Sequence, residues 1–279
     1  MFLLIDSGST KTDYSFLKNG CVKRTFQTSG YNPYYHTPAQ ITTVLKTEFP
    51  NDLPFDDVTK IVYYGSGCST ETNCLVIADA LQFFFKKAHI KVHHDLLAAA
   101  HALLGRSEGI ACILGTGSNS CYYDGENILE NVPSLGFMLG DEGSGATIGR
   151  ELLKAYFYGE FPEDLAQKFS EMFPLTLDAI LTEVYQGKKP SKFIASFAPF
   201  AKAHETHPTI KKLLAKVFDA FIDAQLSKYS RYQEVPVGFI GSIAYYFNDS
   251  LRERLSNANI QMGTVLPSPS KGLIRYYSE

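Results

Sequence analysis

One pattern occurs twice in this sequence, once in each half: an apolar run, a turn rich in Gly, Ser and Thr, and a second strand-like run. The first copy is FLLIDSGSTKTDYSFL at residues 2–17, and the shorter second copy is GIACILGTGSNSCYYDG at residues 109–125. Both are typical of a β-hairpin that has a buried first strand. Because an internal duplication decides a whole fold, we expect two similar halves.

The first hundred residues predict the element order βββαβαβα, in which the first three strands are antiparallel neighbours. The expected strands are Phe2–Ile5, Asp13–Leu17, Cys21–Thr28, Lys60–Tyr64 and Ile90–His93, and the expected helices are Thr37–Phe49, Thr72–Lys87 and Asp95–Leu104. Alternating strands and helices of this kind are typical of an α/β domain.

The second half predicts the same order with a helical insertion at about 160–232. The apolar residues Ile210, Leu213, Leu214, Val217, Phe218, Phe221 and Ile222 mark one face of a long helix in it, which we interpret as core packing. A strand at Val235–Ile240, a helix opened by Gly241-Ser242, a strand at Ile260–Val265 and a short last helix follow. We therefore expect an α/β fold of two lobes, 1–106 and 107–279, with a cleft between them. As an alternative, the last helix packs back on the first lobe.

Composition excludes several classes of protein. A net charge of -3 over 279 residues gives no electrostatic case for binding nucleic acid or an anionic membrane. The longest apolar stretch, Leu96–Leu104, is far shorter than the ~20 residues of a membrane span, and the N-terminal apolar run is too short for a signal peptide. The five cysteines form no C-x-x-C pair, and Cys112 and Cys121 lie in strand-like runs. We expect a soluble, cytoplasmic protein with reduced, buried thiols.

The two Gly/Ser/Thr turns suit phosphate binding. Glycine lets the backbone approach a ligand, and successive free N–H groups form an anion-binding nest. Ser9 and Thr10 add hydroxyl donors to the first turn, Lys11 adds positive charge, and residues 115–118 form a second cradle. Neither turn has the spacing of a Walker A loop. The alternative is that each is an ordinary turn.

Three acidic positions have both a chemical and a structural interpretation. Asp6, at the end of the first strand, fits a Mg²⁺ ligand acting through water, or else an Asx turn. Asp95 fits a general base that takes a proton from a hydroxyl nucleophile, or else a helix N-cap. Asp141 and Glu142, in the GDEGSG loop before an expected helix at Ala146–Tyr158, fit a loop that binds a polyhydroxyl ligand, or else a capping role.

The motifs DSGSTKTD, LGTGSN, GDEGSG and GFIGSIA occur in the order found in actin-like sugar kinases and heat-shock chaperone ATPases. As a set, over residues 2 to about 248, they resemble most the N-acetylglucosamine kinases of the BadF/BadG/BcrA/BcrD ATPase family. The resemblance implies two ribonuclease-H-like lobes that close over ATP, Mg²⁺ and an amino sugar.

The same resemblance implies a role for each matching residue. The first hairpin, with Asp6, Gly8, Ser9, Thr10 and Lys11, becomes the first phosphate loop, and Thr116, Gly117 and Ser118 the second. Gly241 and Ser242 become the turn beside the adenosine, and Asp95 becomes the base. The sugar-binding residues implied are Asn32, Ser118, Asn119, Gly136 and Asp141.

The implied reaction is transfer of a phosphoryl group to an amino sugar, with N-acetylglucosamine 6-phosphate as the expected product. Leu135 stands where the animal enzymes have Trp, so glucosamine, N-acetylmuramate and other amino sugars stay open as substrates. The alternatives are an activator ATPase of 2-hydroxyacyl-CoA dehydratases, which shares an iron–sulfur cluster across a dimer, and a non-catalytic ATP or sugar sensor. Whether the chain forms a homodimer is left open.

Overall fold

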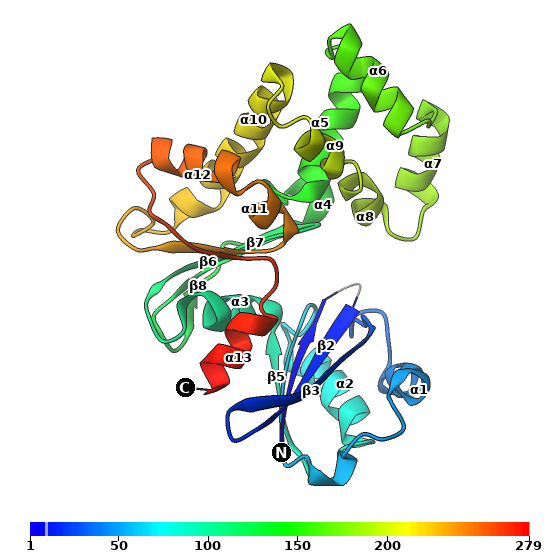
Figure 1. The fold of residues 1–279 in the computed structure, drawn as a ribbon, viewed down its shortest axis with the longest axis vertical. Coiled ribbons are helices and arrows are strands. Elements are labelled where there is room, and N and C mark those ends of the chain that lie inside the picture. Colours follow the sequence, from blue (N-terminus) through cyan, green and yellow to red (C-terminus); the bar gives the residue numbers. More distant parts are fainter. Residues whose placement is uncertain (9–10, 279) are drawn as a thin grey trace. The chain divides into compact units, whose positions relative to one another are not determined.

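The computed structural model describes residues 1–8 and 11–278, which form two compact units (Figure 1). The first unit is Met1–Gly105 together with the chain from Pro269, and the second is Arg106–Ser268. We propose that these units are the two predicted lobes. The predicted second lobe, 107–279, then has to be shortened, because the last helix belongs to the first unit.

The first unit contains a five-stranded sheet in the order β3-β2-β1-β4-β5. Its strands are β1 (Phe2–Ser7), β2 (Lys11–Lys18), β3 (Cys21–Ser29), β4 (Lys60–Gly65) and β5 (His89–His94). Strands β1, β2 and β3 form the predicted antiparallel meander, while β4 and β5 run parallel to β1. All five predicted strands are confirmed, because apolar alternation against a buried face fixes their register.

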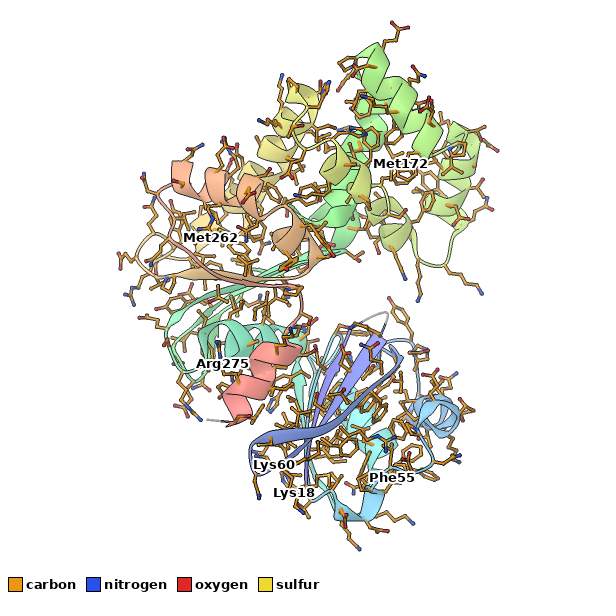
Figure 2. The ribbon with its side chains drawn as sticks, viewed as in Figure 1. Lys18, Phe55, Lys60, Met172, Met262 and Arg275 are labelled. Atoms are coloured by element: carbon orange, nitrogen blue, oxygen red, sulfur yellow. The ribbon has the colours of Figure 1, made fainter. Side chains whose placement is uncertain are left out.

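Helices cover both faces of this sheet (Figure 1). Helices α1 (Pro38–Glu48) and α2 (Glu71–Gln82) share a core with Leu3, Ile5 and Ile61, whose side chains point to one face. Helices α3 (Asp95–Leu104) and α13 (Ser270–Ser278) lie together on the other face, and Figure 2 labels Arg275 of α13. Nη2 of Arg275 donates a 3.4 Å hydrogen bond to the Ala102 carbonyl. A short 3-10 helix, η1 (Phe55–Asp57), precedes β4.

The sheet of the second unit repeats this topology. Its order, read as β8-β7-β6-β9-β10, again places the third, second, first, fourth and fifth strands side by side. The strands are β6 (Gly109–Leu114), β7 (Ser118–Tyr123), β8 (Ile128–Glu130), β9 (Val237–Ile240) and β10 (Met262–Leu266). Strands β6, β7 and β8 are antiparallel, and β9 and β10 run parallel to β6. The predicted fold class, two ribonuclease-H-like lobes, is confirmed.

The helical insertion of the second unit lies between α5 and β9 (Figure 1). The helices of this unit are α4 (Gly136–Leu139), α5 (Gly145–Phe157), α6 (Glu163–Met172), α7 (Leu177–Gln186), α8 (Pro190–Ala195), α9 (Ala198–Ala203), α10 (Pro208–Ala224), η2 (Leu226–Lys228), α11 (Ser242–Tyr246) and α12 (Asn248–Asn257). The predicted apolar stripe of α10 is fully part of the core. In the described parts of the chain, no helix has the length and apolar character needed to cross a membrane.

Candidate functional site

The carboxyl ends of the parallel strands in the first unit bring two predicted acidic residues to one edge of the sheet. Ser7 of β1 pairs with Gly65 of β4, and Gly65 pairs with His94 of β5. Asp6 therefore lies one residue before this edge and Asp95 one residue beyond it. Because neighbouring strands are about 4.8 Å apart, β1 and β5 are roughly 10 Å apart. Loops at such an edge are where α/β sheets bind ligands.

Asp6 lies in an environment with an excess of negative charge. Its half-buried carboxylate accepts a hydrogen bond of 3.1 Å from Ser270 Oγ, at the first residue of α13. Burial raises the pKa of Asp6 to about 7; the Ser270 bond lowers it, the charges of Asp13 and Asp95 raise it, and Lys11 lowers it. The Lys11 ammonium itself lies 3.0 Å from the Asp13 carboxylate. A divalent cation would offset this excess of negative charge.

The first turn does not form the Asx turn that was the alternative for Asp6. That turn needs the N–H of Gly8, which instead donates a 3.0 Å hydrogen bond to the Lys11 carbonyl. The Asp6 carboxylate is therefore not bonded to the Gly8 N–H. Ser9 and Thr10, predicted as phosphate donors, lie outside the described residues.

Asp95 is the first residue of α3 and is not its N-cap. His94 occupies that position, and its Nδ1 accepts a 3.2 Å hydrogen bond from the Leu96 N–H. The N-cap interpretation of Asp95 is thus wrong. Burial raises the pKa of Asp95, while the charge of His94, whose Nδ1 lies 3.1 Å from Asp95 Oδ1, and the backbone N–H groups of residues 95 and 96 lower it. A half-buried carboxylate with a raised pKa suits a general base.

Asn32, predicted to bind sugar, is packed against the loop that follows β4. Its Oδ1 accepts a 2.9 Å hydrogen bond from the Tyr34 N–H. A Cβ atom on Gly67, which has a φ of +83°, would lie 2.5 Å from that same Oδ1. Nδ2 of Asn73 donates a 2.8 Å hydrogen bond to the Gly67 carbonyl and fixes the loop from the other side. Asn32 therefore belongs to the same edge of the sheet as Asp95.

In the second unit, the start of α5 holds the second predicted phosphate turn. The Gly145 N–H donates to the Gly115 carbonyl at 2.8 Å, and the Ala146 N–H donates to the Thr116 carbonyl at 3.1 Å. Ser144 caps the helix, since its Oγ accepts a 3.2 Å bond from the Thr147 N–H. The capping interpretation of Asp141 and Glu142 is therefore wrong.

Asp141 instead lies against the second turn. Its Oδ1 accepts hydrogen bonds from the Ser118 N–H at 3.3 Å and from Ser134 Oγ at 3.1 Å. A Cβ atom on Gly117 would lie only 2.7 Å from Asp141 Oδ2, so glycine is what allows this contact. Burial raises the pKa of Asp141, and the two hydrogen bonds lower it. The Ser118 hydroxyl is buried and has no hydrogen-bond partner among the described residues.

Two further predicted sugar residues lie in the second unit. Gly136 opens α4 with a φ of +73°, and a Cβ atom there would meet no heavy atom within 4 Å. Asn119 Oδ1 accepts hydrogen bonds from the Ser120 N–H at 2.9 Å and from Asn131 Nδ2 at 3.0 Å. Gly136 thus borders open space, whereas the oxygen of Asn119 is used to hold the local strands.

Gly241 and Ser242 lie beside an apolar pocket. Gly241 has a φ of +121°, and a Cβ atom there would lie 2.2 Å from the Leu114 carbonyl oxygen. The pocket has a volume of about 480 Å³ and is lined from α8, α9 and α11, with Ser242, Tyr246 and Phe247 on one side. Its size and its aromatic and aliphatic lining suit a flat heterocycle.

Each unit thus contributes a distinct set of the predicted residues. Asp6, Lys11, Asn32 and Asp95 belong to the first unit, together with Gly8. The second unit holds Thr116, Gly117, Ser118, Asn119, Gly136, Asp141, Gly241 and Ser242. Sequence reasoning missed His94, Ser134 and Ser270, which contact the predicted acids; only His94, directly before Asp95, carried a local signal.

The cysteines and the metal-ligating residues bear on the alternatives. Cys112 and Cys121 are buried as predicted, and burial raises the pKa of both thiols. They are therefore unsuited to hold a cluster shared across a dimer, which needs accessible thiolates. Within residues 1–8 and 11–278, no three His, Cys, Asp or Glu side chains form a group able to hold a metal ion. Mg²⁺ needs less, because one carboxylate, waters and substrate phosphates suffice.

Comparison with known proteins identifies relatives among solved structures. A protein from Porphyromonas gingivalis, described as a "putative N-acetylglucosamine kinase", is 40% identical over 100% of this chain and 99% of its own, with a TM-score of 0.95. A protein of the same description from Chromobacterium violaceum is 16% identical over 99% and 98%, with a TM-score of 0.68. A ROK family transcriptional regulator, described as a homolog of the E. coli MLC protein, is 13% identical over 99% and 78%, with a TM-score of 0.61. The last two show the fold alone. No family model and no curated protein sequence matches the chain.

Proposed function

Since the chain belongs to the same family as the P. gingivalis protein, we propose that it is an ATP-dependent sugar kinase. The acceptor is a hydroxyl of an amino sugar, and the product we propose is the 6-phosphate of N-acetylglucosamine. One observation carries this proposal: Asp6 and Asp95 lie at the same edge of one sheet, Asp6 forms no Asx turn with Gly8, and His94 rather than Asp95 occupies the N-cap of α3. The edge therefore offers both a cation ligand and a base.

The catalytic role falls to Asp95. Phosphoryl transfer asks little covalent chemistry of the protein, so positioning and charge stabilisation supply most of the rate. The remaining task is to remove the proton of the attacking hydroxyl, and the Asp95 carboxylate takes that proton as the bond to phosphorus forms. A raised pKa makes the carboxylate a stronger base than a free aspartate.

Asp6 fits the role of a Mg²⁺ ligand. Its carboxylate is half-buried, is oriented by Ser270, and has the negative charges of Asp13 and Asp95 near it. Such a site favours a hard cation held by one carboxylate through water. When bound, Mg²⁺ would neutralise charge on the phosphate oxygens; the chain's own contribution is to place the Asp6 carboxylate.

The nucleotide is assigned to the two turns and to the pocket beside Ser242. The Lys11 ammonium and the backbone of Thr116 and Gly117 supply donors for phosphate oxygens, and Gly8, whose own N–H bonds the Lys11 carbonyl, keeps the first turn free of a side chain. The pocket at α9 and α11 takes the adenine ring against Tyr246 and Phe247. Its apolar lining supports this assignment, since a purine is flat and gains most from burial and stacking.

The sugar is assigned to Asn32 in the first unit and to the Asp141 loop in the second. The Asp141 carboxyl group accepts hydrogen bonds from Ser118 and Ser134 and would receive hydroxyl donors of a sugar in the same way. Ser118 supplies a further hydroxyl, and Gly136 leaves room for the ligand. Each of these groups is of a kind that binds a polyhydroxyl substrate.

The direct test is sugar-dependent release of ADP from ATP and Mg²⁺ with a panel of hexoses and hexosamines. We expect turnover with an amino sugar and little without it. Asp95→Asn should lower kcat by ~10²–10⁴ while leaving the affinity for ATP unchanged, because only the proton acceptor is lost. Asp79→Asn, at an exposed position of α2, is the matched control and should behave as wild type.

Two outcomes would contradict the proposal. ADP release that is independent of any sugar would indicate an ATPase or a sensor. Near-normal turnover in Asp95→Asn would remove Asp95 from the mechanism, and an unchanged affinity for ATP in that variant shows that the loss of rate, if found, is not a loss of folding.

A further inference from the structure

The side chain of Ser66 is in an unusual state for a polar group. Its Oγ is shielded from solvent, and it has no hydrogen-bond partner in residues 1–8 and 11–278. Buried hydroxyl groups in folded proteins are nearly always paired, because water that solvated them in the unfolded chain is lost. An alanine at this position would avoid that loss. Packing of the fold therefore does not explain why residue 66 is a serine.

Ser66 lies between the strands that carry the two acids of the site. It directly follows Gly65, the last residue of β4, which pairs with Ser7 of β1 on one side and with His94 of β5 on the other. The Ser66 N–H donates a 3.2 Å hydrogen bond to the Ser7 carbonyl, so the backbone is fixed to the end of β1. The hydroxyl is thus held in the middle of the edge between Asp6 and Asp95.

The next residue points to the kind of ligand. Gly67 packs against the amide of Asn32, which is the sugar residue of this unit in the proposed function. In the second unit, the Ser118 hydroxyl is likewise buried and unpaired, and it was assigned to the sugar from its motif. An unpaired buried serine hydroxyl therefore occurs in each unit beside a residue assigned to sugar binding.

From this placement we propose that Ser66 Oγ hydrogen-bonds the acceptor sugar beside the hydroxyl that Asp95 deprotonates. The ligand supplies the partner that residues 1–8 and 11–278 lack. This inference rests on the proposed function and adds a substrate-binding residue that the sequence motifs do not contain. It also predicts that replacing Ser66 lowers kcat/KM for the sugar without lowering the stability of the protein.

The test compares Ser66→Ala with Ser69→Ala, a serine of the same loop that is exposed and lies 3.2 Å from the Tyr34 hydroxyl. In Ser66→Ala we expect kcat/KM for the sugar to fall roughly tenfold, the worth of one hydrogen bond to a ligand. The KM for ATP should stay within about twofold of wild type, and Tm should be equal or higher, because an unpaired buried group is removed. Ser69→Ala should change none of these values.

Several results would overturn the inference. A kcat/KM for the sugar that is unchanged in Ser66→Ala would show that the hydroxyl does not contact it. A rise in the KM for ATP alone would place the hydroxyl on phosphate instead. A lowered Tm with a parallel loss for both substrates would make Ser66 structural. Wild-type protein without any sugar-dependent ADP release would remove the proposed function and this inference with it, whereas active wild type with unaffected Ser66→Ala removes only the inference.

Discussion

At the scale of single residues, one atom of His94, its Nδ1, contacts both the start of α3 and the Asp95 carboxylate. Nδ1 of His94 accepts from the Leu96 N–H at 3.2 Å and lies 3.1 Å from Asp95 Oδ1. A neutral imidazole with its lone pair on Nδ1 can cap the helix, whereas a protonated ring donates to the carboxylate and gives up the cap. The state of His94 therefore acts directly on the proposed base.

This coupling predicts the pH dependence of the reaction. The base acts in its ionised form, so at saturating Mg²⁺, which favours the ionised form of Asp6, kcat/KM falls as pH decreases through the pKa of Asp95. That pKa is already raised by burial, and the charge of His94 lowers it. His94→Gln removes the charge, so we expect the acidic limb of the kcat/KM profile to move to higher pH. The profile of His89→Gln, at the exposed start of β5, should match wild type.

An acidic limb that stays in place in His94→Gln, or that moves to lower pH, would contradict the assignment of that limb to Asp95. The rate at high pH serves as an internal control, because the base is ionised there in both proteins. If His94→Gln is slower at every pH, the substitution has done more than remove the positive charge of His94.

The acids of the site could be found from sequence, but their partners could not. Asp6 and Asp95 were predicted because they follow apolar strands at the ends where loops gather ligands. Ser270, which bonds Asp6, is 264 residues away along the chain, so no local pattern links the two. The capping roles considered for Asp95 and Asp141 were wrong because His94 and Ser144 occupy the cap positions.

At the scale of elements, Gly241 sets the junction between β9 and α11. Strand β9 runs parallel to β6, and the chain must turn into the helix where it passes the end of β6. A Cβ atom on Gly241 would lie 2.2 Å from the Leu114 carbonyl oxygen, and the φ of +121° is strained for other residues. The atoms that this Cβ would meet belong to the backbone, so no side chain can move to make room for it.

We therefore expect Gly241→Ala to lower the free energy of unfolding by about 2 kcal/mol or more, measured by urea denaturation. Gly115→Ala is the matched control, since a Cβ atom there meets nothing within 4 Å and its φ is not positive. An equal loss in both variants would show that the close approach at Gly241 carries no special cost. A normal stability for Gly241→Ala would show that β9 and β6 can separate locally.

The sequence predicts whether a segment is a strand or a helix better than it predicts where that element ends. The strands of both sheets follow from apolar runs and turns, because one buried face enforces alternation. Helix α2 was predicted as Thr72–Lys87 but ends at Gln82. Apolar spacing continues through Phe85, yet that side chain is fully buried in a turn, where Gln82 Nε2 bonds the Phe85 carbonyl at 2.9 Å. Tertiary packing of Phe85 thus outweighs the helical pattern.

At the scale of the whole molecule, the chain forms two separate hydrophobic cores, and its last segment packs on the first of them. The buried clusters of the two units share no residue, and α13 closes the first unit from the far end of the sequence. Its contacts include the Tyr277 and Tyr64 hydroxyls, which lie 2.6 Å apart, the fully buried Leu273, and the bond from Ser270 to Asp6. The duplicated hairpins predicted two lobes, but a nine-residue helix carries no signal that selects one of them.

The docking of α13 depends on one glycine, and this gives a test of the two-core arrangement. A Cβ atom on Gly272 would lie 2.4 Å from the Ala102 carbonyl oxygen of α3 and 2.7 Å from the Ala102 Cβ. Gly272→Ala should therefore push the helices apart at a cost of about 1–3 kcal/mol. Because each unit has its own core, we expect native-state hydrogen exchange to accelerate by roughly 5- to 100-fold in α3 and α13 and to stay unchanged in α5 and α10. Sugar-dependent turnover should fall as well, since Ser270 leaves Asp6.

Gly263→Ala in β10, where the nearest atom is at an ordinary 3.4 Å, should alter neither region. Acceleration spread evenly over both units would mean that they unfold as one body and that α13 does not belong to the first core alone.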